Sequence, residues 1–197
     1  MNQYLSKKVG LVLGGIILLS AFFQVLQEYF GILLWGYHRI SFHDTFWWQW
    51  LTPSLVHMNW MHWLLNILNL IALVMIFASA WNIWRLVGLF ISSSFIIMIC
   101  LYLFSPNIMY YVGMSGVLYA LVVYSALLCL KQQPFISSTI LVYVTLKLTA
   151  HDWVNQMMGV DKALSNMPIV TDVHWYGTII GIIFFIIHKV YIFFTIK

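Results

Sequence analysis

Residues 83–104 read IWRLVGLFISSSFIIMICLYLF, an apolar run in which Arg85 is the only charged side chain. A helix needs about 20 predominantly apolar residues to cross the hydrocarbon core of a bilayer. Five further runs have this character, with inexact edges: 9–30, 55–79, 114–130, 135–150 and 173–194. The sequence therefore predicts an all-α polytopic membrane protein with six transmembrane helices.

The overall composition agrees with this class. Hydrophobic residues make up 63% of the chain and charged residues only 7%, whereas roughly a quarter of the residues in a soluble domain are charged. A water-soluble fold is therefore excluded. The apolar runs do not alternate every second residue, so they are not strands of a barrel. Because the connections are short, we expect one membrane domain over residues 1–197.

The distribution of basic residues predicts how the chain sits in the bilayer. With the N-terminus in the cytoplasm, the inner side receives Lys7, Lys8, Arg85, Lys131, Lys189 and Lys197, and the outer side receives Arg39, Lys147 and Lys162. This asymmetry follows the positive-inside rule and places both termini in the cytoplasm. The net charge of +4 is thus a topology signal, and no nucleic-acid partner is indicated.

The first apolar run has an alternative interpretation. Lys7 and Lys8 precede it, as basic residues precede the core of a signal peptide. The run is long for a signal peptide, lacks a small-residue cleavage signature and is followed by further spans, which favours a retained first helix.

Polar side chains at membrane depth are costly and mark functional sites by default. The first cluster is HMNWMHWLLN at 57–66, in which His62 and Asn66 lie one helical turn apart and share a face. Both side chains can donate hydrogen bonds to one point, or they can simply bond neighbouring helices. A zinc site is disfavoured, because there is no H-E-x-x-H motif and His57 is five residues from His62.

The second cluster is VGMSGVLY at 112–119, where an outer loop enters the fourth predicted span. Gly113 permits close backbone approach before a helix start, and the first turn of the helix leaves N–H groups free for a negative charge. Ser115 lies in that turn, and Gly116 follows it. Gly-x-Ser-Gly is a weak motif by itself, because serines are ordinary in membrane helices.

The third cluster is DVHWYGTIIG at 172–181. Gly177 and Gly181 form a G-x-x-x-G face, which usually means close helix packing. His174 lies one turn before Gly177, so the same approach would carry its imidazole toward the neighbouring helix. All three clusters begin spans at the outer face. A neutral imidazole is the side chain suited to take a proton from a serine near pH 7, so we expect His174 to serve Ser115.

These residues resemble the rhomboid family of intramembrane serine proteases over about residues 48–185. The family marks are H-x4-H-x3-N, G-x-S-G and H-x2-G-x3-G, and this chain matches them in order. The matching residues are His57, His62, Asn66, Gly113, Ser115, Gly116, His174, Gly177 and Gly181. Two conservative departures are Met114 and Val173, where leucine and alanine are more usual.

The resemblance implies a role for each matching residue. Ser115 would be the nucleophile and His174 the general base of a dyad, while His62, Asn66 and the Ser115 backbone N–H would stabilise the oxyanion. Tyr119 matches the aromatic residue that stacks on the catalytic imidazole, and His57 matches a structural residue. Asp172 is interpreted as a charge at the end of a loop. No metal or organic cofactor is implied.

A narrower resemblance is to the rhombosortase branch, which comprises small bacterial rhomboids. It depends on HDWVNQMMG at 151–159 and on PIVTDVHWYG at 168–177. The branch implies a bacterial inner membrane with the active site opening toward the periplasm. It also implies secreted substrates held by a C-terminal tail with a Gly-Gly motif, one apolar helix and a basic end.

Two other functions compete with proteolysis. A non-catalytic rhomboid-like protein would bind transmembrane clients, but such relatives generally lack the serine and the histidine that this chain retains. A small transporter would show broken or repeated spans in its two halves, and the sequence contains no such repeat.

Overall fold

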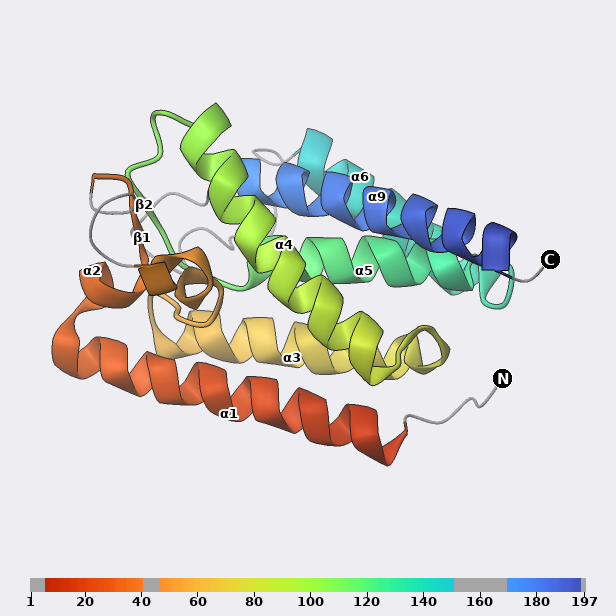
Figure 1. The fold of residues 1–197 in the computed structure, drawn as a ribbon, viewed down its shortest axis with the longest axis horizontal. Helices are drawn as coiled ribbons and strands as arrows, with labels where there is room; N and C mark the ends of the chain where they lie inside the picture. The colour runs from red at the N-terminus through yellow and green to blue at the C-terminus, as the bar shows by residue number, and fades with distance from the viewer. Residues whose placement is uncertain (1–5, 41–46, 151–169, 196–197) are drawn as a thin grey trace.

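A computed structural model describes residues 6–40, 47–150 and 170–195 of the 197-residue chain. This part of the chain is a bundle of α-helices with short 3₁₀ helices and one small sheet (Figure 1). In chain order the elements are α1 (Lys7–Phe30), α2 (Ile32–Trp35), β1 (Tyr37–His38), η1 (Trp47–Trp50), η2 (Thr52–Ser54), α3 (Trp60–Ile76), η3 (Ala78–Ala80), α4 (Ile83–Phe104), β2 (Tyr110–Tyr111), α5 (Ser115–Cys129), α6 (Pro134–Thr149) and α9 (Asp172–Thr195).

The predicted all-α class is confirmed, and each of the six predicted apolar runs corresponds to one helix. These helices are α1, α3, α4, α5, α6 and α9. Among the described residues, α1, α4 and α9 are long and apolar enough to cross a membrane, while α3, α5 and α6 are shorter apolar helices.

Polar residues at the helix starts explain several of these boundaries. The Asn82 side chain accepts a hydrogen bond from the Arg85 N–H at the start of α4, and Ser6 caps α1 in the same way. The second predicted run began at residue 55, but α3 begins at Trp60. The Asn59 side chain accepts from the His62 N–H, and this cap fixes the helix start and leaves residues 55–58 as a loop.

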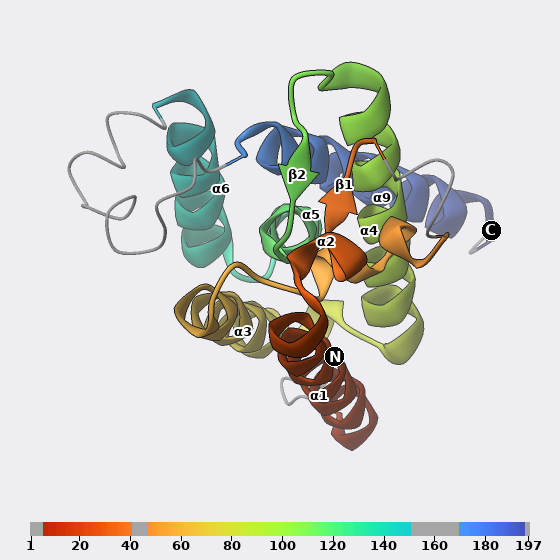
Figure 2. The same ribbon diagram turned by 90° about the vertical axis from the view of Figure 1, so that its left-hand side faces the viewer.

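Helix α5 occupies the centre of the bundle. The end-on view of Figure 2 shows it surrounded by α3, α4, α6 and α9, with α1 packed outside against α3 and α4. Most of the α5 side chains are buried, including Val117, Leu121 and Tyr124. The residue at the first position of α5, Ser115, therefore lies close to several helices.

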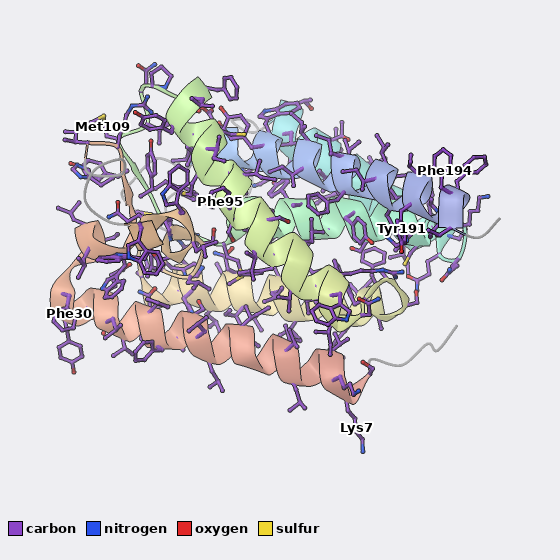
Figure 3. All side chains as sticks on the ribbon, in the orientation of Figure 1. Lys7, Phe30, Phe95, Met109, Tyr191 and Phe194 are labelled. Atoms are coloured by element: carbon purple, nitrogen blue, oxygen red, sulfur yellow. The ribbon has the colours of Figure 1, made fainter. Side chains whose placement is uncertain are left out.

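The outer surface of the bundle is apolar. Large side chains project from it at Phe30 and Phe194, which are 64% and 72% exposed (Figure 3). In water such a surface would be costly, whereas lipid tails match it. Together with the long apolar helices, this surface makes the chain an integral, multi-pass membrane protein.

One end of the bundle carries the small sheet and the starts of α3, α5 and α9 (Figure 1). In this sheet β1 pairs antiparallel with β2, with Tyr37 opposite Tyr111. Arg39 follows β1 and donates to the carbonyl oxygens of Leu101 and Tyr102, at 3.2 and 2.8 Å. Since the last carbonyls of a helix lack partners within the helix, Arg39 caps α4 and ties the sheet to the bundle.

Candidate active site

The candidate site begins with the contact between α5 and α9. A Cβ added to Gly177 would lie 2.0 Å from the Gly116 carbonyl oxygen, and one added to Gly181 would lie 2.6 Å from the Ala120 carbonyl oxygen. Gly116 in turn faces the backbone of Val173. The two glycines of the G-x-x-x-G pattern therefore bring the two backbones into direct contact, as the sequence predicted.

This close approach brings Ser115 and His174 together. The Nε2 atom of His174 lies 3.0 Å from Oγ of Ser115, within hydrogen-bonding distance. His174 is buried, and its ring stacks on Tyr119 with the centroids 4.4 Å apart and the planes inclined by 16°. Tyr119 thus fixes the plane of the imidazole that faces the serine.

A tight turn precedes Ser115. Gly113 has a φ of 126°, a conformation that residues with a side chain rarely adopt. Its N–H donates to the Pro53 carbonyl oxygen at 2.8 Å, and its own carbonyl accepts from the Tyr111 hydroxyl at 2.6 Å. Burial raises the pKa of Tyr111, so this hydroxyl stays protonated and remains a donor.

Helix α5 starts at the end of this turn. Its first intrahelical hydrogen bond runs from the Leu118 N–H to the Met114 carbonyl oxygen. The N–H groups of Ser115, Gly116 and Val117 therefore have no carbonyl partner within the helix. Such N–H groups at a helix start favour negative charge. The Ser115 hydroxyl lies beside this group of donors.

Two histidines form the opposite side of the turn. The His62 ring faces Gly113, where an added Cβ would lie 3.0 Å from its Cε1 atom. The His57 ring meets His62 edge to face with the centroids 5.1 Å apart, and its Nε2 accepts from the Met114 N–H at 3.4 Å. His57 is fully buried and precedes α3 rather than belonging to it.

Asn66 lies one turn below His62 and is buried. Its amide nitrogen donates to the His62 carbonyl oxygen at 2.9 Å. That nitrogen carries two hydrogens, so one remains for another acceptor. This bond joins a side chain to the backbone of the same helix, and the joint role of the His62 and Asn66 side chains as donors stays a prediction.

Asp172 belongs to a different network. Its carboxylate accepts from the Ser105 hydroxyl, whose oxygen also lies 2.7 Å from the Tyr176 hydroxyl. Asp172 and Tyr176 flank His174 on the first turns of α9, and Ser105 ends α4. The carboxylate is therefore an anchor for the start of α9, in line with its interpretation as a charge at the end of a loop.

Sequence reasoning missed a set of polar residues on α1. Ser20, Gln24 and Gln27 are buried and hydrogen-bond to residues 55–57, directly behind the candidate site. Their signal was present in the sequence, because they recur at intervals of four and three within an apolar run. That spacing places them on one helix face.

The described residues contain no group of three histidine, cysteine, aspartate or glutamate side chains that could hold a metal ion. The segment at 151–159, on which the resemblance to rhombosortases depends, lies outside the described residues. The part of the site within them consists of the serine, the imidazole and a set of hydrogen-bond donors. A serine next to an imidazole and next to fixed donors has the parts needed for acyl transfer.

Comparison with known families agrees with the geometry. The family model for the Rhomboid domain matches residues 44–193, which includes α3 to α6, nearly all of α9 and every residue named at the site except those on α1. A comparison with curated proteins returns no match. Members of the matched family are generally intramembrane serine proteases. The chain belongs to the rhomboid family.

Proposed function

We propose that this protein is a serine endopeptidase that cleaves a membrane-anchored protein by means of a dyad of Ser115 and His174. The observation that carries the proposal is the 3.0 Å distance between Ser115 Oγ and His174 Nε2. At this distance a neutral imidazole accepts the hydroxyl proton as the oxygen attacks a carbonyl. Stacking on Tyr119 supports the role of His174 as base, because it holds the imidazole ring in the orientation that faces the Ser115 hydroxyl.

Attack on the carbonyl creates an oxyanion, which requires preorganised donors. The proposed donors are the Ser115 N–H, His62 and the remaining amide hydrogen of Asn66. The N–H belongs to the first turn of α5, and His62 packs against Gly113 two residues before the serine. The resulting acyl-enzyme is hydrolysed by water that His174 activates.

We further propose six membrane crossings with both termini in the cytoplasm. In support, Lys7, Arg85 and Lys131 lie at the starts of α1 and α4 and after α5, all at the end of the bundle opposite the site. Helix α5 has 15 residues and at about 1.5 Å per residue covers about 22 Å, less than the roughly 30 Å hydrocarbon core. A short central helix favours a serine below the membrane surface.

The proposed substrates are secreted proteins that carry a C-terminal tail with a Gly-Gly motif, an apolar helix and a basic end. This proposal depends on the resemblance of residues 151–159 and 168–177 to rhombosortases. Cleavage outside the apolar helix, at the outer face of a bacterial inner membrane, would release such proteins. Small residues suit a site where an extended backbone must enter between helices.

The dyad is tested by labelling the purified protein in detergent with a fluorophosphonate probe. We expect labelling of the wild type and none of Ser115→Ala or His174→Ala. Ser125→Ala is the matched control, because Ser125 is a buried serine of the same helix that donates to the Leu121 carbonyl oxygen. Its labelling should equal that of the wild type.

The alternative function is that of a non-catalytic protein that binds transmembrane clients. A folded wild type that stays unlabelled, while a known rhomboid is labelled alongside, would overturn the protease function and favour this alternative. If labelling succeeds, the substrate class is tested by coexpression with a secreted protein that carries the Gly-Gly tail. We expect release that requires Ser115 and that is lost when the two glycines are replaced by valine.

A further inference from the structure

Helix α1 carries an unusual polar face for a helix in lipid. Ser20, Gln24 and Gln27 are 0%, 1% and 8% exposed, within a helix whose other residues from Val9 to Leu26 are apolar or glycine. Polar side chains at membrane depth are retained only where they find partners. All three find them in one place, the loop at residues 55–57 that precedes α3.

The two glutamines hold the backbone of His57. The Gln24 amide nitrogen donates to the His57 carbonyl oxygen at 3.1 Å, and the Gln24 amide oxygen accepts from the His57 N–H at 2.8 Å. Gln27 donates to the same carbonyl oxygen at 2.6 Å. Both backbone groups of His57 are thus satisfied by α1, and the peptide is clamped from one side.

The clamped residue contacts the turn that carries the nucleophile. On the side of the turn, His57 Nε2 accepts from the Met114 N–H, and the His57 ring supports the ring of His62. His62 in turn packs against Gly113. Gln24 and Gln27 therefore reach Met114 through His57, and Gly113 through His57 and His62, although they lie on a peripheral helix of the bundle.

We infer that Gln24 and Gln27 are positioning residues of the active site, which act through His57 on the oxyanion side of the turn. The inference rests on the proposed serine-protease function. Loss of the clamp frees the His57 peptide, and His62 and the Met114 N–H then lose their fixed position. Attack by Ser115 should slow while the fold persists, because the contact of α5 with α9 does not involve α1.

The test uses Gln24→Met and Gln27→Met in the full-length protein, since methionine nearly keeps the size and shape of glutamine and removes its donor and acceptor. Tyr124→Phe is the matched control. It also removes one hydrogen bond of a buried side chain, that between the Tyr124 hydroxyl and His188 Nδ1 at 2.8 Å. That bond lies at the end of α9 away from the site. Folded protein is isolated by size exclusion before each measurement.

The readout is the kinetics of fluorophosphonate labelling, separated into the probe's binding constant and its maximal rate of reaction. We expect the maximal rate to fall about tenfold or more in Gln24→Met, which loses two bonds, and less in Gln27→Met, which loses one. The binding constant should stay within about twofold. Tyr124→Phe should label at the wild-type rate even if it melts at a lower temperature.

Each outcome has a distinct meaning. Variants that label at the wild-type rate, or a control that slows as much as they do, overturn the positioning role while the protease function stands. An unlabelled wild type overturns the protease function itself. If Gln24→Met yields no folded protein, Gln27→Met carries the test under the same criteria, and a wild-type rate there overturns the inference.

Discussion

The side of the candidate site that carries Ser115 and His174 is assembled by backbone contact between α5 and α9, whereas the side that carries His57 and His62 is assembled by hydrogen bonds from α1. On the first side glycines leave no room for an added Cβ. On the second side the glutamines of α1 donate hydrogen bonds to the backbone carbonyl of His57, in the loop before α3. Both solutions fit a lipid environment, where apolar side chains gain little from contacting one another.

The two solutions should fail in different ways. The backbones of α5 and α9 are in direct contact and leave no free space, so any added atom must push the two helices apart. A hydrogen-bonded clamp has several members, so the loss of one leaves others in place. Substitutions on the side with the glycines should therefore be harmful when they add volume. Substitutions on the side with the glutamines should be harmful when they remove hydrogen-bonding groups.

The largest expected effect is that of Gly177→Ala. The new Cβ would lie 2.0 Å from the Gly116 carbonyl oxygen, which is backbone and cannot turn aside. We expect a loss of stability of about 3 kcal/mol or more, measured by unfolding in detergent with increasing dodecyl sulfate, and no fluorophosphonate labelling.

The matched control is Gly15→Ala on α1, where an added Cβ meets nothing within 4 Å. Because alanine is the better helix former, it should leave stability unchanged or raise it by up to about 1 kcal/mol. Equal changes in stability for the two substitutions would contradict the view that the backbones of α5 and α9 are in direct contact.

An intermediate effect is expected for Ser105→Ala. It leaves Asp172 and the Tyr176 hydroxyl without their shared partner at the start of α9. We expect a loss of about 1–2 kcal/mol and slower labelling, because His174 lies between the two freed residues. The control is Ser92→Ala, because the Ser92 hydroxyl donates to the carbonyl oxygens of Gly88 and Leu89 in its own helix. A loss in Ser92→Ala as large as that in Ser105→Ala would show that the anchor is not special.

The smallest effect concerns Tyr119. Tyr119→Phe keeps the ring that stacks on His174 and should label within about twofold of the wild type. Tyr119→Leu removes the stack, for which we expect a cost of about 0.5–1.5 kcal/mol and labelling slowed severalfold. Identical labelling of the two variants would mean that stacking does not orient the imidazole.

Much of the fold followed from local signals. The apolar run at 83–104 coincides with α4, and the pattern of Gly177 and Gly181 predicted the contact that the structure contains. Helix boundaries were less well predicted where a single cap decided them. Helix α3 begins at Trp60, five residues after the start of the predicted run, because the side chain of Asn59 caps the helix there.

The sequence by itself determined the membrane environment, the helices and the residue types of the candidate site, because these depend on composition and on spacing within one helix. The sequence also paired Ser115 with His174, but only the tertiary structure decided which partners the other buried polar residues meet. Gln24 and His57 are 33 residues apart, and their hydrogen bonds depend on how α1 packs against the loop before α3. The same holds for Ser105 and Asp172. A polar residue in an apolar run indicates that a hydrogen-bond partner is needed. Which residue becomes that partner depends on how the helices pack.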